Sequence, residues 1–422
     1  MPRTDVVVIG AGLAGLACAA ELAESGASVF LAAKGMATTH WTHGGLDVAA
    51  VPEATTPRAA VRALAARPGH PYGVLHADVE AAVERHLARV SSAGLPMHGS
   101  MDDDLVPIPT AIGTLRRAAI LPAAQAAALD PWSGTGLLIV GIAGYRDAWA
   151  AYAARNLAGT EWPGGPTEIR AIEVSLPGLE ELRNLSGRTL ATRFDDPAWR
   201  TRAIRALGEV VPPGTWRVAV PAVLGINDHA RVLAEAETAL GQRIFEVASL
   251  PPSVPGMRLY EALRTVILAA GGRIQVGFDV VEVERQGRSI VAIHTEAASR
   301  SLRLAADEFV LATGGIGGEG IRARPDGSLS ERVFDLPVEA PPREKWFSDS
   351  PLMPHPVEAL GIRVDASLRP VGPDGAPALE NVRVIGSALA GMRYLEERCG
   401  DGVALSSAHA AAQRLATGRA AA

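Results

Sequence analysis

Three glycines near the start of the chain have the spacing that binds a phosphate. Gly10, Gly12 and Gly15 follow the apolar segment VVVI and precede a run of small and apolar residues, an order typical of a strand, a tight turn and a helix. The first glycine permits the turn, the second lets backbone approach a phosphate, and the third lets helix and strand pack closely. The N–H groups that begin such a helix favour an anion. The predicted contacts to the phosphate of a dinucleotide or flavin are Gly10, Gly12, Leu13, Ala14 and Gly15.

The next predicted strand, Val29 to Ala33, ends without the carboxylate that a dinucleotide site usually has. In such sites an acidic residue about 20 positions after the glycines binds the ribose hydroxyls. Here that position falls on Ala33 or Lys34. We therefore expect either a ligand without an adenosine ribose or a ribose bound by other groups. Lys34 and Gly35 are predicted to lie beside the cofactor.

A second turn follows the apolar segment DEFVLA, which we interpret as a buried strand. Thr313 and Gly314 come at its end, where glycines bring backbone next to a ligand. Flavoproteins with two dinucleotide-binding domains carry a similar Ala-Thr-Gly turn. Upstream, the sequence predicts a helix from about Met257 to Ala270, followed by strands that would complete the same domain.

A third segment lies near the end of the chain. A strand ending at Ile385 precedes Gly386 and Ser387, and a helix is predicted to begin near Gly402 and Val403. The free N–H groups and dipole of a helix N-terminus would suit the N1/O2 edge of a reduced flavin, which carries negative charge. Three such segments in this order favour a flavin site over the alternative, a generic α/β enzyme.

The length of 422 residues exceeds the usual size of a single core, so we expect two domains, one inserted in the other. The predicted class is α/β: a Rossmann-like FAD/NAD(P)-binding flavoprotein domain, with a parallel sheet and helices on both faces, and an inserted α/β cap. The insertion carries the strands LLIVGI and WRVAVPAV and the helices YRDAWAAYAARNL and HARVLAEAETAL. We expect residues 1–99 and 251–422 to form the flavin domain, with its C-terminal flavin-contacting helix, and residues 100–250 the cap.

Two further stretches are assigned to structure. The turn GIAG in the cap has only two glycines, so we interpret it as a strand-to-helix turn and not as a second nucleotide site. Residues 336–356 are rich in proline and are predicted to be a connector or a subunit-facing loop.

The composition excludes several classes of partner. Hydrophobic residues make up 48% and charged residues 20%, as in globular proteins, and the net charge of −6 leaves no basic stripe for nucleic acid. Two cysteines, Cys18 and Cys399, indicate a reducing compartment and exclude an iron–sulfur cluster built by this chain alone. The histidines and cysteines show no metal-ligand spacing, so no metal is expected. No apolar run is long enough to cross a bilayer, so membrane contact would be through a partner.

Several pieces of the sequence resemble one family, the B subunit of anaerobic glycerol-3-phosphate dehydrogenase, over nearly the whole length. The longest is LPPSVPGMRL, from Leu250 to Leu259. The shorter pieces are HPY (His70 to Tyr72), GTLR (Gly113 to Arg116), VGIAG (Val140 to Gly144), and IGS with the later CG-x-GV.

The resemblance implies a flavin subunit, reported as FMN-dependent, of an assembly that oxidises sn-glycerol 3-phosphate to dihydroxyacetone phosphate. Electrons would pass to a quinone through an iron–sulfur subunit that anchors the assembly at the membrane, and the same complex contains another flavin subunit. The chain would then be cytoplasmic and peripheral at the inner membrane through its partners. A chain without cluster ligands would need such a partner.

The resemblance also bears on the absent carboxylate. FMN has no adenosine ribose, so the glycine turn and Lys34 would have only one phosphate to balance; FAD held by backbone is the alternative. The similar succinate dehydrogenase and fumarate reductase flavoproteins attach FAD through a histidine a few residues before a Gly-Gly. Counted back from Gly44 and Gly45, that position is Thr38, so a non-covalent flavin is expected beside these glycines.

Three side chains are candidates for the chemistry that the resemblance implies. Oxidation of a secondary alcohol needs hydride transfer to the flavin, a base for the hydroxyl proton, and cations for the substrate phosphate. Histidine suits the base, and His40 follows the second strand; a hydrogen bond to backbone or to the cofactor phosphate is the alternative role. Arg116 and Arg258 are candidates for phosphate or flavin contacts because a guanidinium binds such oxygens bidentately; a surface ion pair is their alternative.

Two other functions are compatible with the sequence. The chain could relay electrons or hold the complex together while another flavin subunit oxidises the substrate, since no strongly marked acid–base constellation is visible. It could also be a standalone FAD-dependent oxidoreductase acting on an amine, steroid or dicarboxylate. The absent ribose carboxylate and the LPPSV segment argue against the latter.

Overall fold

The computed structural model describes residues 4–297 and 300–420 and divides the chain into two compact units. The first comprises Met1–Thr39, Asp47–Gly94 and Tyr260–Ala422, and the second His40–Leu46 and Leu95–Leu259. The second unit is thus longer at both ends than the cap expected over residues 100–250. It also takes in the short segment after the second strand, because the backbone N–H of Ser253 donates to the His40 carbonyl at 2.7 Å.

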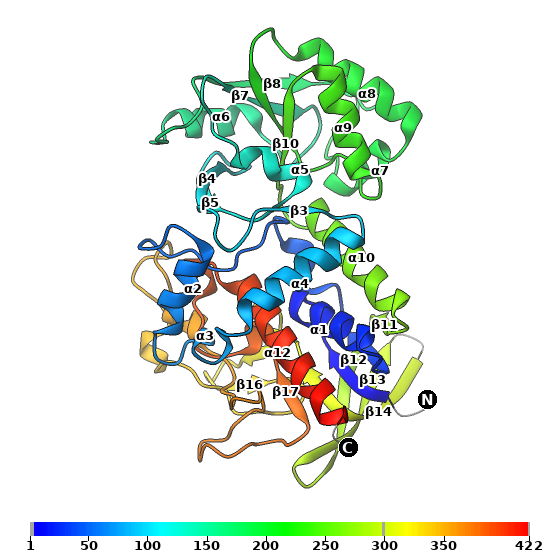
Figure 1. The fold of residues 1–422 in the computed structure, drawn as a ribbon, viewed down its shortest axis with the longest axis vertical. Coiled ribbons are helices and arrows are strands. Elements are labelled where there is room, and N and C mark those ends of the chain that lie inside the picture. Colours follow the sequence, from blue (N-terminus) through cyan, green and yellow to red (C-terminus); the bar gives the residue numbers. More distant parts are fainter. Residues whose placement is uncertain (1–3, 298–299, 421–422) are drawn as a thin grey trace. The chain divides into compact units, whose positions relative to one another are not determined.

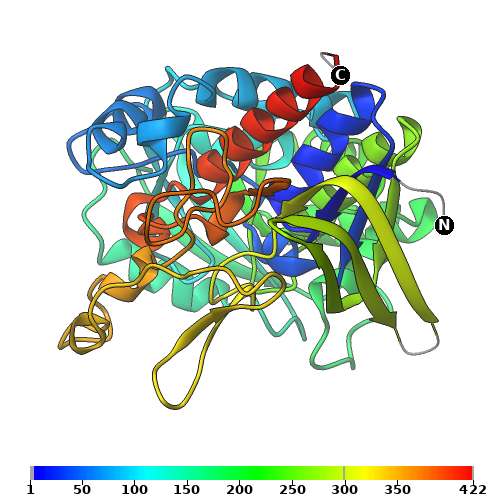
Figure 2. The same ribbon diagram turned by 90° about the horizontal axis from the view of Figure 1, so that it is seen from below.

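The first unit is built on a seven-stranded sheet of order β11-β2-β1-β14-β13-β12, with β17 also paired to β14. Its parallel strands are β1 (Thr4–Ile9), β2 (Val29–Ala33), β11 (Arg273–Val276), β14 (Arg300–Leu311) and β17 (Val382–Val384). The antiparallel extension, yellow-green in Figure 2, consists of β12 (Asp279–Gln286) and β13 (Ser289–Ala297) beside β14. The expected parallel sheet therefore carries an antiparallel edge, as many large sheets do.

Helices of the first unit pack on this sheet. The helix α1 (Leu13–Glu24) is buried along most of its length, as expected for its run of alanine and leucine. The helix α12 (Gly400–Ala420) lies beside α1 and α4 (Val79–Ser92), in red, blue and cyan in Figures 1 and 2. The helix α10 spans Val254–Ala269 and begins three residues earlier than predicted; its residues from Tyr260 on belong to the first unit and those up to Leu259 to the second.

The second unit is a four-stranded parallel sheet of order β10-β9-β7-β8 with helices around it. The strands are β7 (Gly136–Ile142), β8 (Ile169–Val174), β9 (Trp216–Pro221) and β10 (Arg243–Val247). The helices are α6 (Ala150–Ala158), α7 (Gly187–Phe194), α8 (Pro197–Val210) and α9 (His229–Leu240). The segment HARVLAEAETAL forms α9 as predicted, whereas α6 begins five residues after Tyr145 because residues 143–148 form turns.

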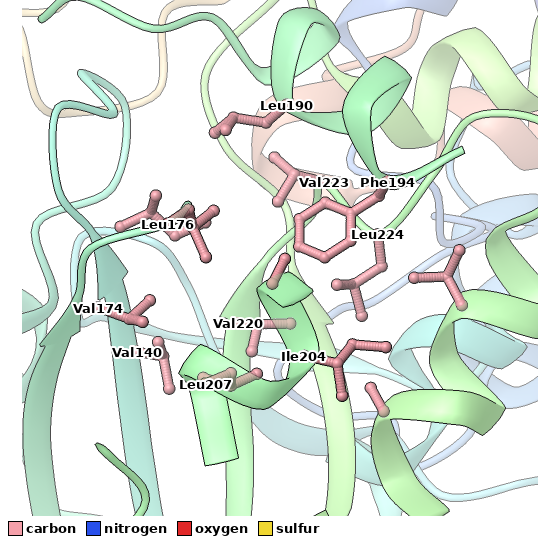
Figure 3. Packing of buried hydrophobic residues seen from close by; sticks show 14 of the residues in the cluster. Val140, Val174, Leu176, Leu190, Phe194, Ile204, Leu207, Val220, Val223 and Leu224 are labelled. Carbon is pink, nitrogen blue, oxygen red and sulfur yellow. The ribbon is translucent and has the colours of Figure 1, made fainter. Parts of the chain in front are cut away.

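Apolar side chains from both the strands and helices of this unit form its core (Figure 3). The labelled residues, all buried, are Val140, Val174, Leu176, Leu190, Phe194, Ile204, Leu207, Val220, Val223 and Leu224. A parallel strand covered on both faces is apolar throughout, and β9 is buried at every position. The predicted strands of the insertion thus form the centre of a separate core.

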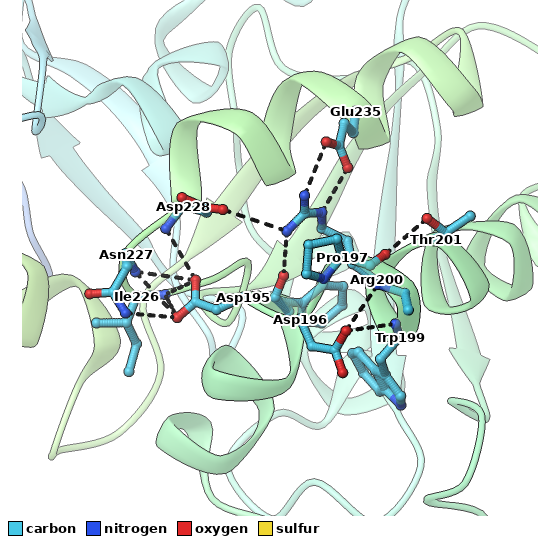
Figure 4. A network of polar contacts seen from close by, with 12 residues as sticks. Asp195, Asp196, Pro197, Trp199, Arg200, Thr201, Ile226, Asn227, Asp228 and Glu235 are labelled. Atoms are coloured by element: carbon cyan, nitrogen blue, oxygen red, sulfur yellow. Dashed lines mark hydrogen bonds and ion pairs between the residues drawn. The ribbon is translucent and has the colours of Figure 1, made fainter.

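Charged side chains lie around the start of α8 (Figure 4), and Arg200 is the buried one among those labelled. Asp196 caps the helix through hydrogen bonds from Ala198 and Trp199 N–H, with Pro197 at the first helical position. The Arg200 guanidinium, only 2% exposed, donates to both carboxylate oxygens of Glu235 at 2.7 and 3.1 Å. A buried arginine needs such bidentate pairing, so this pair joins α8 to α9.

The remaining elements are short. They are η1 (Ala37–Trp41), α2 (Pro57–Ala65), α3 (Tyr72–Leu75), β3 (Met97–His98), β4 (Val106–Pro109), β5 (Leu115–Ala118), β6 (Leu121–Pro122), α5 (Ala123–Ala126), η2 (Ala127–Leu129), β15 (Ile321–Ala323), β16 (Leu329–Glu331), η3 (Arg343–Lys345), η4 (Pro356–Ala359), η5 (Gly386–Ala388) and α11 (Tyr394–Glu397). The proline-rich segment 336–356 is mostly irregular and contains the short helix η3. Its side chains Phe347, Leu352 and Met353 are exposed. Over the described ranges, no helix combines the length and apolarity needed to span a membrane.

One buried histidine should make the first unit sensitive to acid. His86 of α4 is 1% exposed, and neither ring nitrogen has a hydrogen-bond partner among the described residues. Burial, with a smaller contribution from Arg89, lowers the pKa of His86 to about 3. Below pH 6.5 the unfolded chain therefore binds a proton on His86, whereas in the folded unit this histidine stays neutral down to about pH 3. The free energy of unfolding is therefore highest above pH 6.5 and decreases as the pH falls toward 3.

We predict that His86→Leu weakens the loss of stability in acid. Between pH 7.5 and pH 5 the histidine should cost about 2 kcal/mol of folding free energy, which the variant would not lose. Thermal unfolding followed across this pH range tests the difference, with the exposed His76→Leu as the control. Equal acid sensitivity in all three proteins would contradict the assignment.

Candidate functional site

The turn after β1 is formed by backbone packed directly on backbone. Gly10 has a φ of +117°, and a Cβ there would lie 2.3 Å from the carbonyl oxygen of Ala312. A Cβ on Gly15 would lie 2.1 Å from the Gly10 oxygen. Only glycine fits at these two positions, so they hold the ends of β1 and β14 and the start of α1 together.

Gly12 is different because the space in front of it is open. Its φ of −70° suits any residue, and the nearest heavy atom to an added Cβ is that of Ala37 at 3.9 Å. Gly12 is the N-cap of α1 and offers no side-chain cap, so the first N–H groups of the helix, at Leu13 and Ala14, need other partners. This arrangement fits a phosphate, and the cofactor contacts expected of the glycine turn stay a prediction.

The second and third glycine segments meet the first one. A Cβ on Gly386 would lie 2.7 Å from Ala14 Cβ, and one on Gly314 would lie 3.3 Å from Ser387 Oγ. The hydroxyl of Thr313 is buried without a hydrogen-bond partner among the described residues, as expected of a group that binds a polar ligand. Segments near residues 12, 313 and 387 therefore line one edge of the sheet, at the carboxyl ends of β1, β14 and β17.

The start of α12 is packed against protein. The N–H groups of Asp401 and Gly402 both donate to the Asp47 carbonyl at 3.2 Å, and a Cβ on Gly402 would lie 2.0 Å from the Tyr72 hydroxyl. Val403 is fully buried and its N–H donates to the Cys399 carbonyl. The Tyr72 hydroxyl therefore explains why a residue without a side chain is needed at position 402. The flavin contact expected of Gly402 and Val403 stays a prediction.

The Gly-Gly pair after the second strand belongs to the second unit. A Cβ on Gly44 would lie 2.6 Å from Pro255 Cβ, and one on Gly45 would lie 2.5 Å from a Leu121 methyl carbon. Both glycines are therefore required by packing within that unit. Their predicted cofactor contacts remain untested.

Lys34 and Gly35 lie at the open end of β2. Both residues are exposed, and Lys34 Nζ lies 2.7 Å from Oε2 of Glu319 in the loop after β14. Nothing lies within 4 Å of an added Cβ on Gly35. The lysine thus has a carboxylate as its partner, and the cofactor contact expected of Lys34 and Gly35 stays a prediction.

The three predicted catalytic side chains all belong to the second unit. His40 is half-buried in η1, and Arg116 is half-buried in β5, in register with Ile108 of β4. Arg258 is buried in α10 with its guanidinium bound to Glu246 and to the Gly225 carbonyl, the latter at 2.9 Å from Nε. Its side chain and that of Glu246 are 2% and 0% exposed, so these contacts account for its burial without an anionic ligand.

A pocket of the second unit lies where the strand order of its sheet reverses, between β7 and β9. It is small, with a cavity volume of about 30 Å³, although such switch points are common ligand sites. Its walls are mostly alanine, valine, proline and isoleucine, and Asp147 is the one charged side chain among the described lining residues. An acidic group in apolar walls disfavours a phosphate ester, so we do not place the substrate phosphate there.

Comparison with known proteins identifies the family of the chain. The family model described as FAD binding domain matches residues 5–403. The probable B subunit of the anaerobic glycerol-3-phosphate dehydrogenase of Halobacterium salinarum is 31% identical over 97% of each chain. The corresponding B subunit of Pectobacterium atrosepticum is 32% identical over 99% of each chain. The chain belongs to this family of FAD-binding B subunits.

A solved structure, the 3-ketosteroid delta1-dehydrogenase of Sterolibacterium denitrificans, covers 99% of this chain and 100% of its own at 12% identity. Its TM-score of 0.45 is too low to support a conclusion about function. The predicted flavoprotein fold class is confirmed by the family match. That match names FAD, so it supports a flavin but not the preference for FMN that the resemblance implied.

A cluster that the sequence did not predict lies in the first unit. His70 Nε2 lies 3.3 Å from Glu397 Oε2, and Cys399 Sγ lies 3.6 Å from the same oxygen. His70 Nδ1 accepts a hydrogen bond from Tyr72 N–H at 3.1 Å, so the ring proton is on Nε2 and points to the carboxylate. Although these three residue types bind metals, this proton makes the cluster a hydrogen-bonded network that ties the segment before α12 to the HPY piece.

We predict that Gly12→Ala and Gly15→Ala fail for different reasons. The Gly12 variant should fold, because its Cβ has room, yet its flavin content should fall about tenfold or more since the methyl group blocks a phosphate. The Gly15 variant should lose soluble, folded protein because its Cβ meets a carbonyl. Thermal unfolding and the flavin-to-protein ratio separate the two, and normal flavin binding by Gly12→Ala would contradict the phosphate site.

We also predict that Arg258→Ala destabilises the second unit. Removal of the guanidinium leaves the Glu246 carboxylate buried without its partner, at a cost of about 3–5 kcal/mol. Arg243→Ala is the control, because that arginine lies on β10, the strand that carries Glu246, and is 62% exposed. Thermal unfolding measures the effect. A stable Arg258→Ala protein with a raised KM for the substrate would instead place Arg258 in an anion site.

Proposed function

We propose that the chain is the flavin subunit of an anaerobic, quinone-linked glycerol-3-phosphate dehydrogenase complex that oxidises sn-glycerol 3-phosphate to dihydroxyacetone phosphate. The observation that carries the proposal is the meeting of Gly12, Thr313 and Ser387 at one edge of the sheet. An open phosphate turn and an unpartnered hydroxyl there suit a flavin. Relatives named as the B subunit of this enzyme match nearly the whole chain.

The cofactor that we propose is FAD held without a covalent bond. FMN is the alternative, because the carboxylate expected at the end of β2 is absent and Ala33 takes its place. When bound, the flavin accepts the hydride from the carbon of the secondary alcohol. The chain's own contribution to the cofactor is the anion site at the start of α1 and the hydroxyl of Thr313.

The second unit is proposed to supply the groups that act on the substrate. His40 takes the hydroxyl proton as general base, and Arg116 binds the phosphate of glycerol 3-phosphate. Arg258 has a supporting part: it holds the Gly225 carbonyl and Glu246 in place. The apolar pocket around Asp147 is not included in this site.

The partners that we propose are an iron–sulfur subunit, which passes electrons to a quinone, and the other flavin subunit of the complex. Cys18 and Cys399 are both buried, which leaves no thiol pair for a cluster on this chain. Phe347, Leu352 and Met353 are exposed and suit a subunit-facing loop. The chain would then be peripheral at the cytoplasmic face of the inner membrane through these partners.

One observation favours a second function, electron relay or a scaffold within the same complex. The guanidinium of Arg258 is already bound within the protein, so one of the two predicted phosphate-binding arginines is engaged. A standalone oxidoreductase on another substrate is less well supported, because the similarity to the B subunits covers 97% or more of this chain.

Anaerobic titration with glycerol 3-phosphate distinguishes the two functions. If the chain oxidises the substrate, the flavin band of the isolated chain should bleach, whereas a relay subunit should change only when its partners are present. We predict that His40→Gln lowers kcat of the complex about 10² to 10⁴-fold, while the exposed His98→Gln does not. Unchanged turnover of His40→Gln would exclude His40 as the base.

A further inference from the structure

A carboxylate from a distant part of the chain lies close to the end of β2. Lys34 follows directly after β2, and its ammonium binds Glu319, which is 285 residues away. The strands β2 and β14 are the two neighbours of β1, and all three run parallel. Their carboxyl ends therefore share one edge of the sheet, where dinucleotides bind.

The backbone at Glu319 has an unusual conformation. Glu319 has a φ of +60°, in the left-handed region that favours glycine. It belongs to the glycine-rich stretch GGIGGEG, so glycine would be the residue of least strain there. A non-glycine residue kept in such a conformation is a reason to look for function.

The charge and the exposure of the Glu319 carboxylate suit hydrogen bonds from the two hydroxyl groups of a diol. Hydrogen bonding to Lys34 lowers the pKa of Glu319 below its usual value, so the group is ionised near neutral pH and accepts hydrogen bonds only. Its Oε2 atom accepts from Lys34, and Oε1 has no hydrogen-bond partner in the part of the chain that the structure describes. The side chain is 64% exposed and so is open to a ligand.

We infer that Glu319 takes the place of the missing β2 carboxylate and binds the ribose hydroxyls of the adenosine half of FAD. Lys34 is then a positioning residue, which holds the glutamate across the end of the sheet. The inference rests on the proposed flavin function and adds selectivity to it. FMN has no second ribose, so this carboxylate would discriminate between the two flavins.

The test is a binding titration of the full chain, freed of flavin, with FAD and with FMN. Glu319→Gln should raise the Kd for FAD about ten- to hundred-fold, because a hydrogen bond to a charged acceptor is lost. The Kd for FMN should not change. The matched control is Glu339→Gln, an exposed glutamate of the same unit paired with Arg363 at 3.3 Å, which should alter neither.

Each other outcome is decisive. If Glu319→Gln leaves FAD affinity unchanged, the glutamate forms only a surface ion pair, whose effect is usually small, and the inference is wrong. Equal weakening of FAD and FMN would place the effect on the phosphate or the fold and would also overturn it. If the wild-type chain binds neither flavin, the proposed function itself fails, and that result is distinct from both.

Discussion

The first unit depends on one close approach of backbone to backbone. Gly10 lies against the Ala312 carbonyl, and Gly15 lies against Gly10, so β1, β14 and the start of α1 meet with no side chain between them. The parallel register, in which Ile9 is paired with Leu311, brings the two strand ends level. Because no side chain lies there, the first N–H groups of α1, which follow Gly12, have no side-chain cap. These N–H groups form the anion site that we propose for a phosphate.

The second unit depends on two buried arginines and the carboxylates that they bind. Arg200 binds Glu235 across two helices, and Arg258 binds Glu246 while it also holds the Gly225 carbonyl. The Asp195 carboxylate accepts hydrogen bonds from the N–H groups of Ile226 and Asp228, so the loop after β9 is fixed from two sides. Desolvated charges are stable only when their hydrogen bonds are satisfied, which explains why these arginines are structural.

The positions of the catalytic candidates follow from this division. The phosphate turn and the hydroxyl of Thr313 belong to the first unit, whereas His40 and Arg116 belong to the second. The apolar pocket near Asp147 shows that the second unit has cavities unsuited to a phosphate ester.

The sequence alone determined the glycine turn between β1 and α1, because glycine spacing acts through local backbone geometry. It also determined α9 and the strands of the insertion, whose apolar patterns are local. The family resemblance was likewise present in short segments. Only the tertiary structure decided that Arg258 is engaged, that Gly402 makes room for Tyr72, and that Glu319 stands beside Lys34. These contacts join residues far apart in the chain, and neither hydrophobic periodicity nor motif spacing carries information about which distant side chains meet.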